Sequence, residues 1–418
     1  MSSDTVAPFA APAWRWKTVL SVLGPGVVVM LADTEVGSIV TAAQSGARWG
    51  YQLLLLQFLL IPVLYVVQEL TVRLGLSTGK GHAELIRETF GTGWAWVSVG
   101  GLAVACLGAL VTEFSGVAAV GELFGVPRTW SLSLATAALL AVTMTGSYRR
   151  VERVALTLGA FEFVFFLGAV AANPDGRAMV SGLAHAPVGN PSYLYLVAAN
   201  IGAVIMPWMI FYQQSAVVDK RLRPEHYAAA RWDTAIGAVV TQLVMAAVLV
   251  TAAATIGHRH PKGSLDTIGE VTQAIAPVLG ERLGRAVFGI GVLGAGLVAA
   301  IVVSLAVAWG VGEATGCKHS LELGFSEAPW FYAIFDLVVI AGAILVAVAP
   351  NLVTLSVGIE VMNALLLPVV LGFLVVLALR ALPGPHGVHG PYRWVVVGVA
   401  VLTAGLGVCF GLAGVLGS

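Results

Sequence analysis

The hydrophobic residues of this chain gather into long continuous stretches, and short polar loops separate one stretch from the next. A run of about 20 predominantly apolar residues is long enough for an α-helix to cross the hydrocarbon core of a membrane. The pattern predicts about eleven such helices, at residues 18–44, 51–71, 94–124, 129–147, 152–172, 193–215, 230–256, 284–313, 329–349, 352–379 and 394–416. The expected fold class is therefore an all-α integral membrane protein.

The composition supports this prediction and excludes other classes of protein. Of the 418 residues, 58% are hydrophobic and 11% are charged, whereas a soluble domain carries about 25% charged residues. The formal net charge is zero, so the chain has no overall basic field that would attract nucleic acid. The three cysteines are far apart, and no HExxH motif occurs. We expect no enzyme activity, no bound cofactor and no obligate protein partner.

The basic residues indicate how the chain is oriented in the membrane. They concentrate in the loops at 73–87, 148–153 and 219–231. With a cytoplasmic N-terminus, fifteen of the 22 Lys and Arg residues lie inside and seven lie outside, as the positive-inside rule requires. We expect a multi-pass protein of the cell membrane with a cytosolic tail at 1–17, a core at 18–380 and an additional C-terminal helix at 394–416.

Acidic residues interrupt several of the apolar stretches, and hardly any Lys or Arg lies at a comparable depth. Such groups are costly in lipid, so they should face the protein interior or a water-filled path. An excess of carboxylates suits a cationic substrate, although any single one could be a residue at a helix end or an internal hydrogen-bonding group. The residues concerned are Asp33, Glu35, Glu69, Glu113, Glu162, Asp336 and Glu360.

Two of the predicted spans contain helix-breaking sequences. The first is interrupted by polar residues and glycine at 33–38, and the sixth contains Gly202 and Pro207. Pro207 removes a backbone donor in the middle of its span. Because these spans are five apart, they occupy equivalent places in two five-helix halves, at 18–172 and 193–380. Paired broken helices of this kind are typical of transporters with inverted repeats, whose ion site lies between the breaks.

Several short motifs stand out along the chain: Gly46 and the segments 23–26 (LGPG), 50–54 (GYQLL), 74–81 (LGLSTGKG), 148–152 (YRRVE) and 206–207 (MP). Together these motifs resemble the Nramp family of divalent metal transporters, and the likeness runs from about residue 20 to 380. The resemblance implies a LeuT-like fold with a 5+5 inverted repeat and broken helices 1 and 6. It also implies uptake of a divalent metal, usually manganese or iron, with proton movement.

The same resemblance implies which residues bind the metal. Asp33 matches the aspartate of the family's Asp-Pro-Gly-Asn motif, and Ala203 and Met206 match its carbonyl and thioether ligands. The family asparagine falls on Val36 if the motif is anchored at Asp33, and on Ser38 if it is anchored downstream. We favour Ser38, because Gly37 then matches the family glycine and an oxygen ligand is kept. Further candidates for the ion path or its surroundings are Glu35, Gly37, Glu113, Trp208, Gln213 and Asn363.

The chain differs from the family at positions where the family has side chains that bind and transfer protons. Trp208 stands where the family has histidine, Gln213 or Gln214 replaces a second histidine, and Leu110 replaces an aspartate. None of these side chains titrates near neutral pH, so we expect transport without obligatory proton coupling.

The longer first break and Glu35 favour a larger site of hard oxygen ligands, which resembles the magnesium-transporting branch related to Nramp. Met206 favours softer manganese or iron. The expected function is thus alternating-access uptake of Mg²⁺ or Mn²⁺/Fe²⁺ across a lipid membrane. The alternatives are a proton-coupled Mn²⁺/Fe²⁺ symporter and a LeuT-like amino-acid/sodium symporter.

Overall fold

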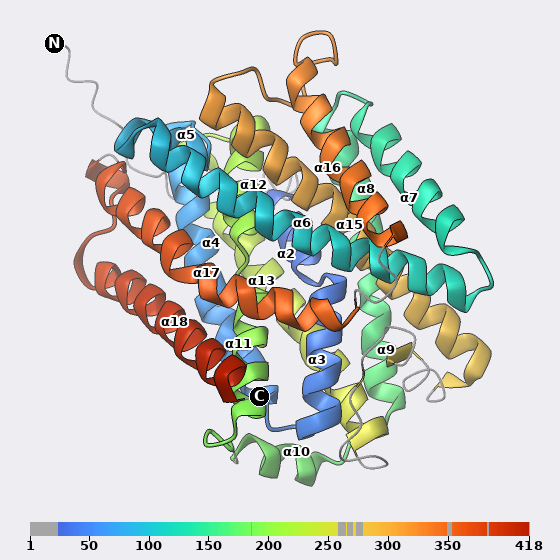
Figure 1. Ribbon diagram of the computed structural model, residues 1–418. Coiled ribbons are helices and arrows are strands. Elements are labelled where there is room, and N and C mark those ends of the chain that lie inside the picture. Colours follow the sequence, from blue (N-terminus) through green and yellow to red (C-terminus); the bar gives the residue numbers. More distant parts are fainter. Residues whose placement is uncertain are drawn as a thin grey trace, which may run out of the picture.

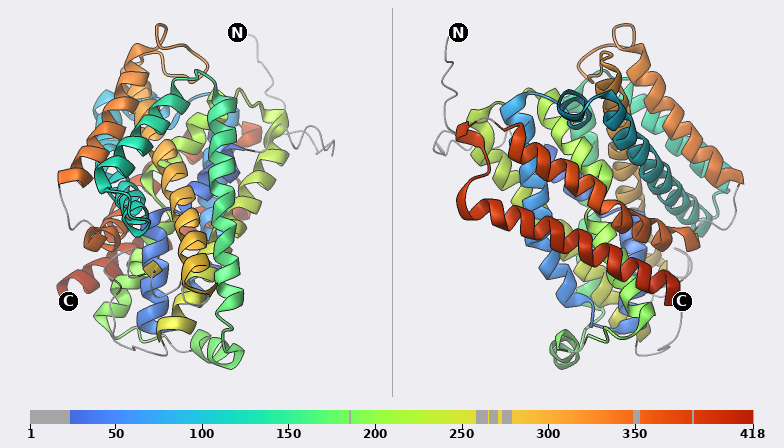
Figure 2. Two further views of the ribbon diagram at one scale, coloured as in Figure 1. Left: turned by 90° about the vertical axis from the view of Figure 1, so that its right-hand side faces the viewer. Right: turned by 60° about the vertical axis from the view of Figure 1, so that its left-hand side comes forward.

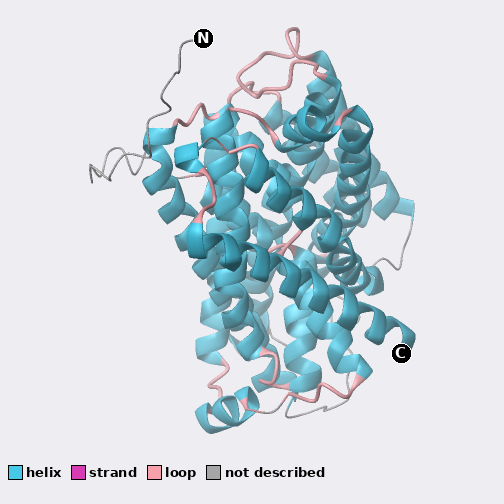
Figure 3. Cartoon of the chain, turned by 90° about the vertical axis from the view of Figure 1, so that its left-hand side faces the viewer, coloured by secondary structure: helices cyan, strands magenta, loops and turns pink. Residues whose placement is uncertain are grey.

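The computed structural model describes residues 24–184, 186–257, 265, 271–272, 279–348, 353–382 and 384–417. The predicted tail at 1–17 lies outside this part. Helices make up its regular structure (Figure 3). The first half contains α2 (Pro25–Asp33), α3 (Val36–Trp49), α4 (Leu54–Thr78), α5 (His82–Phe90), α6 (Thr92–Leu123), α7 (Arg128–Thr143), α8 (Tyr148–Gly159), η1 (Ala160–Phe163), α9 (Val164–Ala171) and α10 (Gly176–Leu183). The second half contains α11 (Pro191–Val204), α12 (Pro207–Asp219), η2 (Pro224–His226), α13 (Tyr227–Ala252), η3 (Ala253–Gly257), α15 (Glu281–Thr315), α16 (Pro329–Val348), α17 (Val353–Arg380), η5 (Gly384–His386) and α18 (Gly390–Gly417).

Within the described residues, nine helices are long and apolar enough to cross a membrane, and the bent pair α2–α3 makes up to ten. The helices α8, η1 and α9 together form one of these spans. The sequence predicted about eleven, and the difference is α7. This helix has 16 residues, so at 1.5 Å per residue it is about 24 Å long, shorter than the hydrocarbon core of about 30 Å.

The first span is broken where the sequence predicted it. The helix α2 ends at Asp33, Thr34 and Glu35 form a short link, and α3 starts at Val36 with an axis bent by 49° from that of α2. Glu35 has an extended backbone, with φ −68° and ψ 169°. The bend lies at the centre of the molecule (Figure 1). It leaves backbone groups outside the regular helix, as expected only where they line a buried site.

The sixth span is also interrupted, and the reason is local. Ile205 and Met206 are extended between α11 and α12, and Pro207 is the first residue of α12. A proline disfavours helical geometry at the preceding residue. It also has no amide hydrogen, so the carbonyl four residues earlier, that of Ala203, loses its helical partner. The break thus provides a buried carbonyl oxygen for another interaction.

The broken spans are enclosed by the longer helices. The helix α13 packs against α2, α3 and α4, while α15 packs against α6, α12 and α16. The helices α17 and α18 run side by side across one flank (Figure 2) and cover α11. Large apolar side chains on the outer helices face outward, as expected for a surface in contact with lipid. They include Trp130, Leu134, Leu337, Val401 and Leu402.

A carboxylate fixes the free end of the first half-helix. Asp233, on α13, accepts hydrogen bonds from the backbone amides of Gly26 (2.7 Å), Gly24 (3.2 Å) and Val27 (3.3 Å). The first amides of a helix have no acceptor within it, and the helix dipole favours a negative charge at this end. Asp233 therefore holds α2 against α13.

We expect Asp233→Ala to lower the free energy of unfolding by about 1–3 kcal/mol, because several buried amides lose their acceptor. Thermal unfolding of the purified protein in detergent measures this change. Glu225→Ala is the control, since it removes an exposed carboxylate at η2 near the start of the same helix. Equal melting temperatures for the two variants would contradict the capping role.

Candidate functional site

The two helix breaks meet through a direct hydrogen bond. Ser38, in the first turn of α3, donates from Oγ to the carbonyl oxygen of Ala203 at 3.1 Å. This is the carbonyl that Pro207 leaves without a helical partner. Met206 follows three residues later, in the extended link directly before α12, and is fully buried. The structure thus brings together two of the ligand positions that the resemblance implied, and places a third beside them on the chain.

Asp33 lies at the end of α2 with part of its hydrogen-bonding capacity unused. Its Oδ2 accepts a hydrogen bond of 3.4 Å from Thr241 Oγ1, which is also 2.8 Å from Thr34 Oγ1. Its Oδ1 is buried and has no hydrogen-bond partner among the described residues. A buried oxygen without a donor is costly unless something else satisfies it. Asp33 can therefore accept a cation.

Sequence reasoning missed Thr241. It orients the carboxylate of Asp33 from α13, but a single threonine in an apolar helix carries no pattern that would distinguish it from its neighbours. Its contact with Asp33 depends on how α13 packs against α2.

Val36 and Ser38, the two candidates for the position of the family asparagine, have different neighbours in the structure. Val36 turns away from α11, because its side chain packs against Gly116 on α6 and Gly296 on α15. Its backbone amide donates to Glu113 Oε2 at 3.3 Å. Ser38, in contrast, places a hydroxyl at the opposite break. Of these two residues, Ser38 is the one whose side-chain oxygen reaches the sixth span.

A second group of polar atoms lies beside the first break. A Cβ placed on Gly37 would collide with Glu360 Oε1 and stand 3.2 Å from Glu35 Oε1. Asn363, one turn after Glu360 on α17, donates from Nδ2 to Glu360 Oε2 at 3.1 Å. These atoms are buried, and the sequence had indicated Glu360 only as an acid in an apolar stretch.

Gln213 does not lie among the predicted ligands; its side chain forms hydrogen bonds that connect neighbouring helices. Its amide oxygen accepts from Thr71 on α4 at 2.8 Å, and its nitrogen donates to Thr234 on α13 at 2.9 Å. The neighbouring Gln214 contacts His82 Nδ1 at 3.0 Å and the carbonyl of Lys80 at 2.9 Å. Both glutamines thus connect helices.

Trp208 is fully buried at the start of α12. Its indole Nε1 has no hydrogen-bond acceptor in the part of the chain that the structure describes. Leu110, which replaces the family aspartate, packs near Gly342 on α16. Neither position provides a titratable group.

Glu69 is not one of the unpaired acids within the membrane spans, in contrast to what the sequence suggested. It forms a salt bridge of 2.7 Å with Arg73, one turn later on α4, and accepts hydrogen bonds from Tyr227 and Tyr392. Glu69 lies in the interior of α4, so the reading as an internal hydrogen-bonding group holds for it, and the reading as a residue at a helix end does not. Glu162, in η1, is different: it is fully buried beside the side chain of Thr34, and it forms no salt bridge within the described chain.

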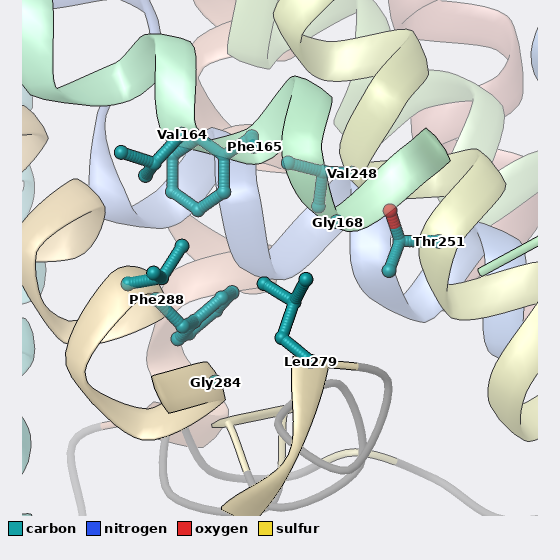
Figure 4. Close-up of a pocket in the computed structure, with 9 residues that line it drawn as sticks. Val164, Phe165, Gly168, Val248, Thr251, Leu279, Gly284 and Phe288 are labelled. Carbon is teal, nitrogen blue, oxygen red and sulfur yellow. The ribbon is translucent and has the colours of Figure 1, made fainter. Parts of the chain in front are cut away.

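Within those same residues, no group of three or more His, Cys, Asp and Glu side chains is arranged to hold a metal ion. The candidate site instead combines one carboxylate with a hydroxyl, a carbonyl and a thioether. The small cavity in Figure 4, between α9, α13 and α15, is lined by apolar side chains and Thr251, whose hydroxyl donates to its own helix. That cavity has no ligands for an ion.

Comparison with known proteins agrees with this geometry. The family described as natural resistance-associated macrophage protein-like, or Nramp, matches residues 26–413. The chain belongs to the Nramp family. It is 30% identical over 307 residues to a divalent metal cation transporter MntH of Xanthomonas campestris, covering 70% of this chain and 68% of that protein. Membership places the chain with transporters and not with enzymes.

Solved structures confirm the fold. A manganese transporter of Eremococcus coleocola, in complex with an aromatic bis-isothiourea compound, superposes with a TM-score of 0.79 at 21% identity, covering 98% of this chain and 89% of that one. MhsT in complex with L-phenylalanine superposes with a TM-score of 0.57 at 14% identity, covering 98% of this chain and 100% of that one. The LeuT-like fold that the sequence predicted is therefore correct.

Proposed function

We propose that this Nramp protein transports divalent metal cations and that Asp33, Ser38, Ala203 and Met206 bind the ion between the two breaks. The contact between Ser38 and the Ala203 carbonyl carries this proposal, because it brings oxygen atoms of both broken helices together beside Met206. Asp33 supplies the negative charge, and its unpaired Oδ1 is available for coordination. When the ion binds, the Ala203 carbonyl oxygen can give up its hydrogen bond from Ser38 and coordinate the metal instead.

The ligand set suits a transition metal better than magnesium. Carboxylate, hydroxyl and carbonyl oxygens accept hard ions, whereas the thioether of Met206 favours softer ones. The relatives are named as divalent metal cation and manganese transporters, which supports manganese. The sequence alone is compatible with Mg²⁺ or Mn²⁺/Fe²⁺ as the substrate, and with a proton-coupled Mn²⁺/Fe²⁺ symporter as the alternative. We therefore propose manganese as the principal substrate, with magnesium as the competing possibility.

The arrangement also suggests how access to the site changes. The half-helices α2 and α3 share no continuous hydrogen-bond ladder across the 49° bend, so α2 can move without α3. In this structure Asp233 ties α2 to α13. Release of that contact would open a path from the ion site to the end of the molecule where α2 begins, which we propose is the cytoplasmic side.

An amino-acid/sodium symporter of the same fold is the less favoured function. The fold alone allows it, as the likeness to MhsT with bound L-phenylalanine illustrates. A substrate carboxylate, however, needs a positive helix end free of negative charge. Here Asp33 and Glu35 occupy the break in the first span and would repel it.

We expect Asp33→Asn to reduce Mn²⁺ uptake into proteoliposomes to the background level, because the site loses its only charged ligand. The variant should fold normally, since Asp33 makes one long hydrogen bond of 3.4 Å. Asp336→Asn is the matched control: it neutralises another intramembrane carboxylate, on α16, and should retain uptake. Wild-type uptake by a folded Asp33→Asn protein would remove the basis of the proposal.

Met206→Ala tests the identity of the ion. If the sulfur binds the metal, the variant should lose affinity for Cd²⁺ and Mn²⁺ more than for Mg²⁺, because hard ions gain little from a thioether. Competition of each ion against Mn²⁺ uptake measures the difference. Met209→Ala, also fully buried on α12, serves as the packing control. Equal losses for all three ions would mean that Met206 only packs.

A third prediction concerns proton coupling. Leu110, Trp208 and Gln213 do not titrate, so we expect Mn²⁺ uptake without stoichiometric acidification of the vesicle lumen. An inside-negative potential is sufficient to drive it, because two charges gain about 4.6 kcal/mol per 100 mV. Vesicles with an internal pH dye and a clamped potential provide the assay. Acidification in proportion to uptake that disappears in Glu113→Gln would establish the proton-coupled alternative instead.

A further inference from the structure

A surface cavity with several basic side chains lies at the end of the molecule where α2 begins. Its volume is about 670 Å³, within the range of about 300–1,000 Å³ that is typical of ligand pockets. It is formed by the start of α8, by the residues that end and follow α12, and by the loop before α16. The basic residues that line it are Arg149, Arg153, Lys220 and Arg221.

The acidic residues of the cavity wall are engaged by the protein itself. Glu152 forms a salt bridge of 2.7 Å with Lys220. Asp219 accepts hydrogen bonds from a hydroxyl and an amide of the loop before α16. Glu322, in the same loop, accepts a hydrogen bond of 3.1 Å from the amide of Tyr148 at the start of α8. These carboxylates therefore join the elements that form the cavity.

The three arginines of the cavity lack such partners. Arg149, Arg153 and Arg221 are exposed, and none of them forms a salt bridge with a described residue. Arg149 attracts the carboxylate of Glu152, but from farther away than a salt bridge. Guanidinium groups match the geometry of phosphate oxygens and bind them through two parallel hydrogen bonds. The cavity thus presents three groups that are suited to one shared phosphate.

The backbone of Arg221 gives an independent observation. Its φ is 57°, and among the described residues the other non-glycine residue with a positive φ is Asn173, a type that tolerates this conformation. The amide of Arg221 donates to the carbonyl of Val218 at 2.9 Å, and that of Leu222 donates to Val217 at 3.1 Å. This pair of bonds ends a helix at a position that glycine usually occupies. An arginine is unfavourable there for the backbone, which indicates a role for its side chain.

We propose that this cavity binds a phosphate-bearing anion, which is the headgroup of an acidic phospholipid or a soluble phosphate. Arg149 and Arg153 lie in the first turns of the span Tyr148–Ala171, and exposed side chains further along it include Phe161 and Leu167. The arginines therefore lie where the span leaves the lipid, at the level of the headgroups. Basic pockets between spans at the cytoplasmic surface bind such headgroups.

The cavity also adjoins the first half-helix. A Cβ placed on Gly24 would collide with Glu152 and stand 2.9 Å from Lys220 Nζ, so the start of α2 packs on the ion pair of the cavity wall. A bound anion would thus lie close to the half-helix whose movement the proposed function requires. Its binding does not depend on the proposed ion site, so the two proposals can fail separately.

The test measures binding to the purified full-length protein in detergent. Native mass spectrometry compares phosphatidylglycerol with phosphatidylcholine of identical acyl chains, and calorimetric titration measures inorganic phosphate. The wild type should bind phosphatidylglycerol about tenfold more tightly than phosphatidylcholine, because a basic residue attracts an acidic headgroup and each such residue is worth about 1 kcal/mol. Arg221→Gly and Arg153→Gln should each weaken this binding about fivefold, the factor for one basic residue.

Two variants separate this effect from folding and from overall charge. Arg221→Gly should melt at or above the wild-type temperature, because glycine adopts a positive φ without strain. Arg150→Gln is the matched control: it removes an exposed arginine of the same helix turn that lies outside the cavity lining, and it should bind as the wild type does.

The outcomes also identify the source of the phosphate. A preference for phosphatidylglycerol that inorganic phosphate does not share assigns the cavity to a lipid headgroup. Binding of inorganic phosphate that weakens in Arg221→Gly and Arg153→Gln but not in Arg150→Gln assigns it to a soluble phosphate. Equal affinity for the two lipids without binding of inorganic phosphate would overturn the inference. Equal losses in Arg150→Gln and Arg221→Gly would also overturn it, because binding would then follow the overall charge alone.

Discussion

An ionised carboxylate in a low-dielectric interior requires a compensating positive charge, and this protein buries several around one helix break. Asp33, Glu35, Glu113 and Glu360 come from α2, the link before α3, α6 and α17, and all are nearly inaccessible to solvent. Among the described residues they form no salt bridge. Glu69 illustrates the opposite case, because Arg73 neutralises it locally. The uncompensated charge at the break accounts for a protein that binds cations.

The backbone breaks make the same region able to coordinate an ion. Pro207 frees the Ala203 carbonyl, and the polar run after Asp33 ends α2 before α3 begins. Each break exposes groups that would be unfavourable in lipid, and each is enclosed by α6, α13, α15 and α17. The breaks, the carboxylates and the enclosing helices thus depend on one another: an ionised carboxylate at this depth is stable with a cation beside it, and without one it takes up a proton.

Much of this architecture could be predicted from the sequence, because membrane spans and helix breaks leave local signals. The long apolar runs located the helices, and Pro207 and the polar residues at 33–38 located both breaks. Local sequence signals could not predict those contacts that depend on how distant helices pack together. The sequence did not indicate that Thr241 reaches Asp33, that Glu360 faces Glu35, or that Gln213 is occupied by two threonines. The span predicted at 129–147 is present as α7, with 16 helical residues, because hydropathy does not define where a short helix ends.

The most direct test of the account is anomalous X-ray scattering at the manganese edge from crystals soaked in Mn²⁺. The central claim is that the charge buried at the first break binds the transported ion together with the sixth span. The strongest anomalous peak should then lie in direct contact with the Asp33 carboxylate, between Ser38 and Met206. A strongest peak away from both breaks, with no density beside Asp33, would contradict the account.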